Sequence, residues 1–327
     1  MHDADFFHIK FFDESNCKNL RLLPNIFFTC HINKLRIACE NGWRYKLFQL
    51  RLLIFEAMQL LNGPGILAEK IFIESEFLKR KIEVDFFLPK NVPDPSQLNL
   101  LLINDGQNLT EMNFQTLLED LYAAERIAPL LCAGIYAGKE RMMEYGVASR
   151  PDYSGRGADA GFYTSFLLQE LIPFIHKNYS ITVFKDKAVA GFSLGGLMAL
   201  DIAWNHPGQF SKAGVFSGSF WWRSVNQEDK FYNDNEHRIM QQEIRNGIYH
   251  PGQKFFFQCG NRDETMDRNN NGIIDSIDDT IAVIDELIAK GYNREKDIFY
   301  LEMPDGKHDV STWAEAMPYF LKWAWKK

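Results

Sequence analysis

Three separated segments of the chain carry side chains that together could activate a serine hydroxyl. The first is Gly191-Phe192-Ser193-Leu194-Gly195, which fits the pattern G-x-S-x-G. An apolar strand-like run, 187–192, leads into it, and an apolar helical run, 195–205, leads out. A nucleophile elbow has this strand–turn–helix context, because its serine occupies a strained turn that exposes the hydroxyl. We therefore predict Ser193 as a nucleophile; the alternative is a glycine-rich turn around a capping serine.

The glycines of this motif have a physical reason in such a turn. Side chains at 191 and 195 are expected to collide with neighbouring backbone. The same turn places the backbone N–H of Leu194 at a helix N-terminus, where it can stabilise an oxyanion. A second oxyanion donor is expected in the loop after the strand 98–103, where the backbone N–H of Gln107 is the candidate. The alternative for that loop is a plain tight turn.

A base and an acid follow the serine in chain order. A serine hydroxyl is a poor nucleophile until a base removes its proton. His308 lies between the last predicted strand, 297–303, and the closing helix, 312–326. The acid that orients the imidazole is expected after the preceding strand, 254–259, where Asp263 and Glu264 are adjacent. We prefer Asp263, and Glu264 remains the alternative.

The segment 267–278 fits an EF-hand-type calcium loop. Oxygen side chains fall at loop positions 1, 3, 5, 9 and 12, and Gly272 occupies the sharp turn at position 6. Aspartate at position 12 makes the loop resemble a dockerin repeat more than a sensor EF-hand. A bound calcium would be structural and would fix the loop that carries the acid; the competing interpretation is an Asn-rich turn that caps the helix at Ser276. The predicted metal ligands are Asp267, Asn269, Asn271, the carbonyl of Ile273, Asp275 and Asp278.

The pattern of elements indicates how these residues are brought together. Strand-like runs alternate with helical runs from residue 98 onward, after a predicted hairpin of 70–80 and 81–89. This alternation predicts an α/β fold with a mainly parallel sheet covered by helices on both faces. Ligands bind outside the carboxyl ends of such strands, and the candidate residues follow strands. The region between 217 and 253 is expected to be an irregular insertion.

Residues 1–65 differ from residues 66–327. They lack clean strand alternation and end at the turn signal Asn62-Gly63-Pro64-Gly65. We interpret them as an appendage of unknown role, or as upstream sequence translated ahead of Met58. The N-terminus does not look like a secretory signal, and the stretch 43–61 holds too many charges for a membrane span. A cytoplasmic protein without membrane contact is therefore expected.

Charge and cysteine content narrow the partners further. The net charge of −7 argues against a nucleic-acid surface, which needs a concentrated basic patch. The five cysteines are an odd number without a CxxC pair, so buried free thiols are expected rather than a zinc site or a disulfide framework. Oligomeric state cannot be derived from the sequence.

Taken jointly, the motifs resemble an esterase family of the α/β-hydrolase superfamily that includes enterochelin esterases, feruloyl esterases and related carboxylesterases. The likeness covers roughly residues 70–327. It rests on five segments of the chain: Leu102-Ile103-Asn104-Asp105-Gly106-Gln107-Asn108, Arg141-Met142-Met143-Glu144-Tyr145, 191–196, Ser217-Gly218-Ser219-Phe220-Trp221-Trp222, and Gly306-Lys307-His308-Asp309 with Trp313.

The resemblance implies hydrolysis of a small-molecule ester through an acyl-enzyme, with no cofactor in the chemistry. It also implies that Arg141, Glu144, Trp221 and Trp222 line or brace the substrate pocket. From spacing alone, Arg141 and Glu144 are an i,i+3 surface pair, and the two tryptophans are core residues. An acyltransferase with the same triad and a non-catalytic ligand-binding protein of this fold remain the alternative functions.

Overall fold

The computed structural model describes residues 19–23, 26–31, 34–39, 65–90, 92 and 94–327. Contacts divide the chain into two units, residues 1–60 and 61–327, close to the boundary expected at residue 65. The described part of the first unit is an antiparallel sheet in the order β1-β2-β3, which the apolar pattern does not predict. Its strands are β1 (Asn19–Leu23), β2 (Ile26–His31) and β3 (Lys34–Cys39).

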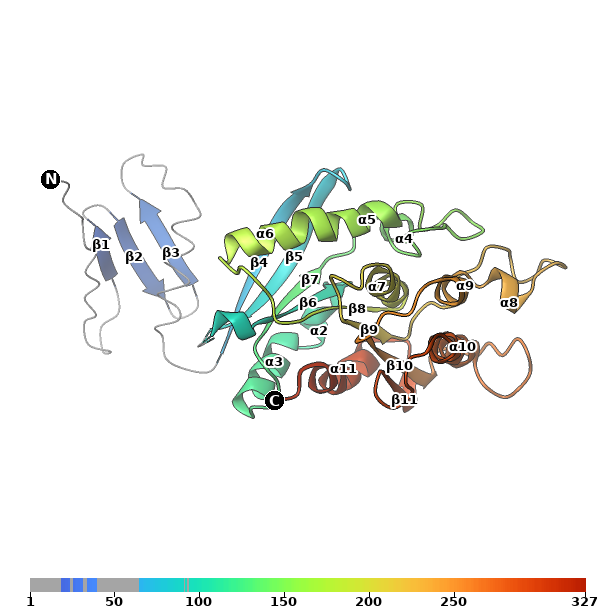
Figure 1. Cartoon of the computed structure of the whole chain (residues 1–327). Helices are drawn as coiled ribbons and strands as arrows, with labels where there is room; N and C mark the ends of the chain where they lie inside the picture. The colour runs from blue at the N-terminus through green and yellow to red at the C-terminus, as the bar shows by residue number, and fades with distance from the viewer. Residues whose placement is uncertain (1–18, 24–25, 32–33, 40–64, 91, 93) are drawn as a thin grey trace. The chain divides into compact units, whose positions relative to one another are not determined.

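The second unit contains an eight-stranded sheet in the order β11-β10-β9-β8-β6-β7-β5-β4 (Figure 1). Neighbouring strands from β7 to β11 are parallel, whereas β4 and β5 form an antiparallel hairpin at one edge. The mainly parallel sheet and the hairpin are both confirmed. The strands are β4 (Ile66–Ser75), β5 (Arg80–Pro89), β6 (Asn99–Asn104), β7 (Leu130–Ile135), β8 (Lys187–Phe192), β9 (Lys212–Phe216), β10 (Lys254–Arg262) and β11 (Ile298–Lys307).

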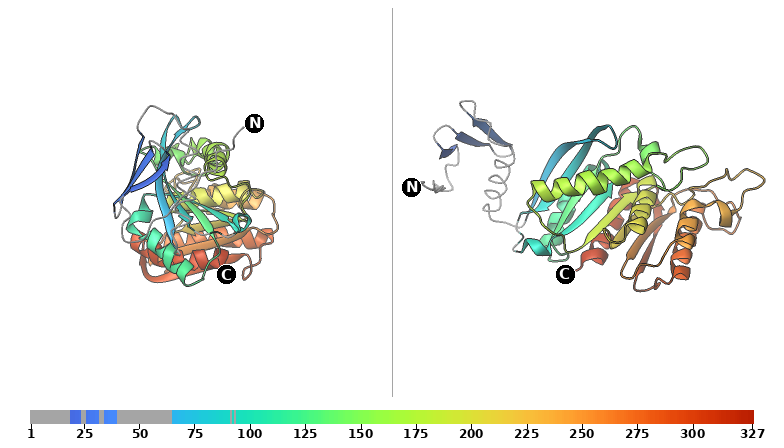
Figure 2. Two further views of the ribbon diagram at one scale, coloured as in Figure 1. Left: turned by 90° about the vertical axis from the view of Figure 1, so that its left-hand side faces the viewer. Right: turned by 45° about the horizontal axis from the view of Figure 1, so that its top comes forward.

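Helices cover both faces of this sheet (Figures 1 and 2). Helices α3 and α11 enclose one core, while α7 packs on β8 and β9 and α10 packs on β10. The helices are α2 (Asn108–Glu111), α3 (Phe114–Ala123), α4 (Arg141–Glu144), α5 (Ala160–Phe166), α6 (Ile172–Asn178), α7 (Leu194–Asn205), α8 (Asp234–His237), α9 (Ile239–Asn246), α10 (Asp275–Lys290) and α11 (Val310–Trp325). A 3₁₀ turn, η1 (Pro95–Gln97), precedes β6.

Two predicted segments differ from the structure. The apolar periodicity of 161–179 predicts one continuous helix, but the structure has a π-helical turn, η2 (Leu167–Leu171), between α5 and α6. The segment expected to be irregular, 217–253, contains α8 and α9, and α9 packs against α10. Its apolar residues Ile239, Met240 and Ile244 are buried. This spacing of i, i+1 and i+5 indicates a helix, but three apolar residues among many polar ones are too few for a clear prediction.

The strands that hold the site rest on an aromatic core. Phe192 of β8, Phe216 of β9, Phe256 of β10 and Phe299 of β11 form a ladder across four adjacent strands, with ring centroids 5.3, 5.6 and 5.3 Å apart. Aromatic pairs on neighbouring strands stabilise a sheet through cross-strand packing. The ladder fixes the spacing of these strands, whose carboxyl ends carry the residues predicted to be catalytic. Of the cysteines, Cys132 and Cys259 are buried free thiols, as expected; the side chains of the other three lie outside the described residues.

Candidate active site

Ser193 stands in a strained turn between β8 and α7. Its backbone has φ 55° and ψ −120°, a region that non-glycine residues rarely occupy. A side chain at Gly191 would lie 2.2 Å from the Gly195 carbonyl oxygen, as the sequence predicts. A side chain at Gly195 would instead lie 2.5 Å from the Asp105 carboxylate, so there the expected backbone clash is a side-chain clash. The turn has the geometry of a nucleophile elbow.

Asn104, the last residue of β6, holds the elbow from the neighbouring strand. The Asn104 side-chain amide donates to the Gly195 carbonyl at 2.9 Å, and the Tyr163 hydroxyl donates to the Asn104 side-chain oxygen at 2.7 Å. All three residues are fully buried. Because a buried hydrogen-bond partner is costly to lose, this chain of contacts fixes the start of α7 relative to β6.

Arg141 and Glu144 belong to two separate ion pairs. Arg141 binds both carboxylate oxygens of Asp105 at 2.7 Å, whereas Glu144 is bound by Arg80 at 2.7 and 2.5 Å. The expected i,i+3 surface pair is therefore wrong, since Glu144 is 3% exposed and Asp105 1% exposed. Sequence spacing could not reveal this, because both true partners lie on distant strands or loops.

The two proposed oxyanion donors lie next to the elbow. Leu194 is the first residue of α7, where a backbone N–H has no partner within the helix. Gln107 is the N-cap of α2, in the loop after β6, and its N–H has no acceptor among the described residues. The Gln107 side chain accepts from the Ala137 N–H at 3.0 Å and donates to Asp105 at 3.2 Å. The loop is therefore held by its own side chain rather than being an unconstrained turn.

Asp263 and Glu264 follow β10 and face different neighbours. Burial raises the pKa of Asp263, and its interactions with Ser217 and with His308 lower it. Burial and the charges of Asp275 and Asp279 raise the pKa of Glu264, and hydrogen bonding with Ser276 lowers it. Of the two acids, Asp263 is the one whose charge acts on His308.

His308 lies in the loop between β11 and α11, where the sequence predicts it. Loss of solvation lowers the pKa of its imidazole; the Asp263 carboxylate opposes this shift, and the Arg141 guanidinium adds to it. No hydrogen bond among the described residues joins Ser193 to His308 or His308 to Asp263. The three residues follow β8, β10 and β11 at the edge formed by the carboxyl ends of the strands, and the structure does not link their side chains to one another. Hydrogen bonds between residues of an active site are often long before substrate binds.

Two serines near the elbow were missed by the sequence analysis as site residues. The Ser219 hydroxyl oxygen lies 3.4 Å from that of Ser193, and the Ser219 N–H donates to the Ser193 carbonyl at 3.1 Å. Ser217 accepts a hydrogen bond from the Trp313 indole at 3.0 Å. Both serines directly follow β9, the strand beside β8, and this position was the signal that could have revealed them.

The two adjacent tryptophans have different environments. Trp222 is fully buried, and its ring fills the space left by Gly146 and Gly157. Trp221 is half-buried, and the Arg156 guanidinium lies 4.8 Å from its ring centroid. Arg156 is held by the buried Asp152 carboxylate. The core role expected from the sequence fits Trp222, whereas Trp221 with Arg156 presents a cationic aromatic surface.

The side chains of the loop 267–278 form hydrogen bonds with one another and with the loop backbone. Asp267 accepts from the N–H groups of Asn271 and Gly272 at 3.1 and 2.9 Å, and Gly272 has φ 86°. Asn269 and Asn271 donate to Asp278 at 2.8 and 2.9 Å. Within the described residues, no group of three His, Cys, Asp or Glu side chains converges to hold a metal ion.

Asp275, predicted as the ligand at position 9, has another partner. Its carboxylate accepts from the Arg268 N–H at 2.9 Å and lies 3.3 Å from the Arg268 guanidinium. Arg268 also pairs with Asp279 and Asp234. In this structure Asp275 therefore anchors the loop to α10 through Arg268, rather than pointing into the loop as a ligand.

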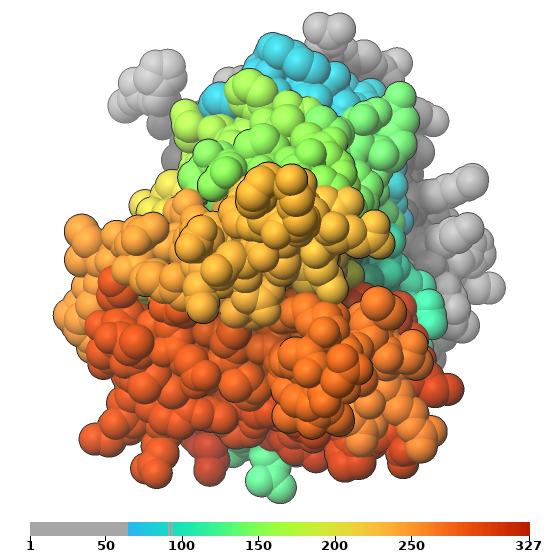
Figure 3. Space-filling model, turned by 90° about the vertical axis from the view of Figure 1, so that its right-hand side faces the viewer, coloured from blue at the N-terminus to red at the C-terminus, as the bar shows by residue number. Residues whose placement is uncertain are grey.

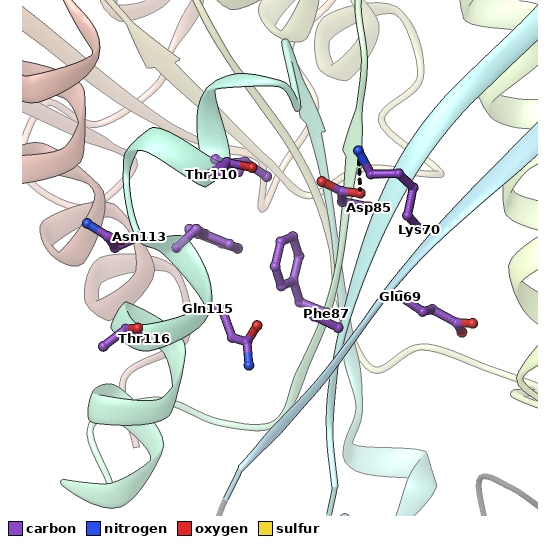
Figure 4. Close-up of a pocket in the computed structure, with 11 residues that line it drawn as sticks. Glu69, Lys70, Asp85, Phe87, Thr110, Asn113, Gln115 and Thr116 are labelled. Atoms are coloured by element: carbon purple, nitrogen blue, oxygen red, sulfur yellow. Dashed lines mark ion pairs between the residues drawn. The ribbon is translucent and has the colours of Figure 1, made fainter. Parts of the chain in front are cut away.

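Figure 3 views the side of the molecule on which these loops lie, with α4 and the loop after it in green, the insertion after β9 in gold and the loops after β10 and β11 in orange to red. A cavity of about 500 Å³ lies elsewhere, between the β4–β5 hairpin and the α2–α3 segment (Figure 4). Phe87, Thr110, Gln115 and the Lys70–Asp85 ion pair line it. None of the predicted catalytic residues lines this cavity.

A family model described as "Putative esterase" matches residues 75–324. The chain belongs to this family. The match includes Ser193, Asp263 and His308, and it begins after the three-stranded unit, consistent with the expected extent of the resemblance.

Relatives of known structure share the fold at low identity. The chain is similar to the enterobactin esterase FES of Shigella flexneri, with 22% identity and a TM-score of 0.60, over 80% of this chain and 59% of that one. It is similar to an IroE-like serine hydrolase of Shewanella oneidensis, with 19% identity and a TM-score of 0.58, over 78% of this chain and 79% of that one. It is also similar to the siderophore hydrolase EstB of Aspergillus nidulans, with 15% identity and a TM-score of 0.57, over 80% of this chain and 98% of that one. These likenesses confirm the α/β-hydrolase fold.

A curated relative, the uncharacterized protein YbbA of Bacillus subtilis, is 28% identical over 142 residues, which are 42% of this chain and 56% of YbbA. The chain thus matches little more than half the length of that relative, and about 60% of the Shigella enzyme. In the part of the chain that the structure describes, no helix combines the length and apolar character needed to cross a bilayer.

Proposed function

We propose that the chain is a serine hydrolase that cleaves a small-molecule carboxylic ester through Ser193, His308 and Asp263. The strained backbone of Ser193 carries this proposal. A non-glycine residue at φ 55° and ψ −120° costs on the order of 1–3 kcal/mol and persists only where the surroundings enforce it. Here a buried polar chain through Asn104 and Gly195 enforces it, and the outcome is a hydroxyl directed out of the turn.

The reaction follows from the roles of these groups. His308 accepts the Ser193 proton while the serine oxygen bonds to the ester carbonyl carbon, and the negative carbonyl oxygen is stabilised by the N–H groups of Leu194 and Gln107. The bond to the alcohol then breaks, and His308 returns the proton to the leaving alcohol. A water molecule, deprotonated by His308, attacks the acyl-enzyme; the acid leaves and Ser193 regains its proton.

Asp263 is assigned as the acid because its charge faces the imidazole. A carboxylate beside the histidine holds the ring in one orientation and stabilises the imidazolium that forms during each proton transfer. Glu264 faces the start of α10 and two other acids instead. Its raised pKa is explained by burial near Asp275 and Asp279, without a catalytic role.

The substrate is proposed to be an ester of an aromatic acid. Trp221 lies two residues after Ser219 and has the Arg156 guanidinium 4.8 Å from its ring centroid, and the Ser219 hydroxyl oxygen lies 3.4 Å from that of Ser193. Aromatic and guanidinium faces stack on planar rings. The name of one similar structure, a ferulic acid esterase, is consistent with this class.

A fluorophosphonate probe tests the proposal directly. It should label the wild-type chain at one site per molecule, and Ser193→Ala should lose both the label and at least about 10³-fold of the hydrolysis of short p-nitrophenyl esters. Ser96→Ala, at an exposed serine in η1 at the start of β6, is the matched control and should keep both. Activity of Ser193→Ala within tenfold of wild type would refute the assignment. Product analysis with a competing alcohol separates hydrolysis from acyl transfer.

We also propose a structural calcium site in the loop 267–278. The side chains of Asp267, Asn269, Asn271 and Asp278 meet in one turn, where the two asparagine amide nitrogens face Asp278, and hard cations prefer oxygen ligands of the kind that these residues carry. Rotation of the two asparagine amides would turn their oxygens toward an ion. Because Asp275 is held by Arg268, the ligand set is smaller than predicted, which lowers the expected affinity. The ion would stabilise the loop that follows Asp263.

A further inference from the structure

Trp313 of α11 contacts Phe192, His308 and Ser217, which belong to three separate segments around the proposed site. Its ring stacks on Phe192, the residue before the nucleophile, with centroids 5.2 Å apart and an interplanar angle of 22°. It also packs nearly perpendicular to the His308 ring, with centroids 5.3 Å apart and an interplanar angle of 82°. Its indole N–H donates to the Ser217 hydroxyl at 3.0 Å. The side chain is only 6% exposed, so these contacts are made without competition from solvent.

Ser217 is fixed in a position that its neighbours dictate. It directly follows β9, between β8 and β10, and its backbone has φ 47°. Its N–H donates to the Gln258 carbonyl of β10 at 2.8 Å, and the residue is 2% exposed. An indole N–H can only donate. The Ser217 oxygen therefore accepts from Trp313, and its own hydroxyl proton remains available for another acceptor.

Asp263 is an acceptor in need of that proton. Both of its carboxylate oxygens are buried, and neither has a hydrogen bond of good geometry within the described residues. A buried carboxylate without donors is costly. The Ser217 side chain is near enough to lower the pKa of Asp263, against the rise that burial causes. An unused donor thus lies beside an unsatisfied acceptor.

We infer that Ser217 and Trp313 are positioning residues for the catalytic acid, joined in a chain from the Trp313 N–H to the Ser217 oxygen and from the Ser217 O–H to the Asp263 carboxylate. This inference rests on the proposed function. Through the chain, one indole ring couples the elbow, the histidine loop and the acid loop, so that the acid is held at the distance His308 requires. The substitution Trp313→Phe separates the packing of Trp313 from its hydrogen bond, because phenylalanine keeps an aromatic ring and lacks the N–H.

The test compares Ser217→Ala, Trp313→Phe and the double variant with wild type. Each single variant should lower kcat roughly ten- to a hundredfold, the effect of losing a hydrogen bond that ends on a charge, and leave KM within about twofold. Because both changes break the same chain, the double variant should lose about as much as one single variant, not the product of the two. Trp323→Phe on the same helix, whose ring packs on Phe256 and Phe320, is the matched control and should keep kcat.

The pH profile supplies a readout that packing alone would not move. Loss of the donor destabilises the Asp263 carboxylate relative to its acid and makes it a stronger acceptor for the His308 proton. Both effects favour proton uptake by the pair, so the acidic limb of kcat/KM in Ser217→Ala should move to higher pH. The other charged or titratable groups facing the pair are Arg141 from α4, Asp309 at the start of α11 and the Cys259 thiol of β10, and they are the same in both proteins.

The outcomes separate the two proposals. If the fluorophosphonate probe does not label wild type, the proposed function fails. If wild type is labelled and active but Ser217→Ala keeps its kcat and its acidic limb, or the two losses multiply, only the positioning chain is overturned. Alanine at φ 47° could weaken folding, so Ser217→Gly, which adopts this φ without strain, repeats the test with the same expected loss. Melting temperatures of all variants verify that folded protein is compared.

Discussion

Arg141 and Asp105 form a bidentate ion pair directly beside the nucleophile turn. Both N···O distances are 2.7 Å, and the Asp105 carboxylate occupies the space that a side chain at Gly195 would need. Arg141 also lies 3.4 Å from the Phe192 carbonyl and lowers the pKa of His308. One guanidinium therefore contributes to the shape of the turn at Ser193 and to the lowered pKa of His308.

Removal of the guanidinium should be more harmful than removal of the pair. Arg141→Met leaves a buried carboxylate unpaired and should lower the free energy of unfolding by about 3 kcal/mol, whereas Arg141→Met with Asp105→Asn should recover part of this. Urea denaturation measures both. Lys139→Met, at an exposed position just before α4, is the control. Equal losses in the single variant and in Lys139→Met would contradict a structural role for the pair.

The elbow should not tolerate a methyl group at Gly191. Its ideal Cβ lies 2.2 Å from the Gly195 carbonyl oxygen, which is backbone and has no rotamer to adopt. Gly191→Ala should cost about 3 kcal/mol or more of stability. Gly208→Ala is the matched control, because a Cβ there has no neighbour within 4 Å. Thermal unfolding distinguishes the two; similar melting temperatures would show that the turn can relax.

The His308 side chain should remain uncharged at pH values somewhat below 7. Burial and the nearby Arg141 charge hold the pKa of His308 below its ordinary value of 6.5, although Asp263 opposes the shift. Because the proposed mechanism needs a neutral His308 imidazole, kcat/KM should be on its plateau at pH 7 and fall with a midpoint below pH 6.5. Asp305→Asn, at an exposed carboxylate before His308, should leave the midpoint unchanged. A wild-type midpoint above pH 7 would show that the carboxylate dominates.

Removal of calcium by a chelator should lower the thermal stability of the protein more than it lowers its activity. EDTA should lower the melting temperature, added calcium should restore it, and kcat at low temperature should change little, because the ion supports a loop and takes no part in the chemistry. Asn271→Ala should abolish the response, whereas Asn270→Gly, which alters no proposed ligand and suits φ 56°, should keep it. A melting temperature that ignores both EDTA and calcium eliminates the calcium site.

Asp201 of α7 should make stability depend on pH. Burial raises its pKa from 3.8 to about 7, against the hydrogen bonds that it accepts from Ala148 and Asn205. The folded state therefore keeps a proton that the unfolded state releases, so this stabilisation is complete below about pH 4, declines as pH rises and is gone above pH 7. Asp201→Asn should gain stability relative to wild type over that window. Denaturation at pH 4, 6 and 8 tests this, with the exposed Asp120→Asn as control; a constant difference would be the contrary result.

The positions of Ser193 and His308 between a strand and a helix were predictable from the sequence. The apolar runs on either side of Ser193 predict the strand and the helix that define the elbow, and both are confirmed. The loop of His308 follows from its place between the last strand and the last helix. Such features depend on periodicity and on turn residues, which act over a few positions along the chain.

The tertiary structure alone decided which side chains meet. Arg141 pairs with Asp105 and not with Glu144, His308 is influenced by Asp263 and not by the adjacent Glu264, and Trp313 reaches Ser217 across 96 residues. These contacts depend on the order, register and twist of eight strands and on the faces that their helices present. Spacing along the chain does not contain that information, because each contact joins elements whose neighbours in the sheet are set by the packing of the whole core.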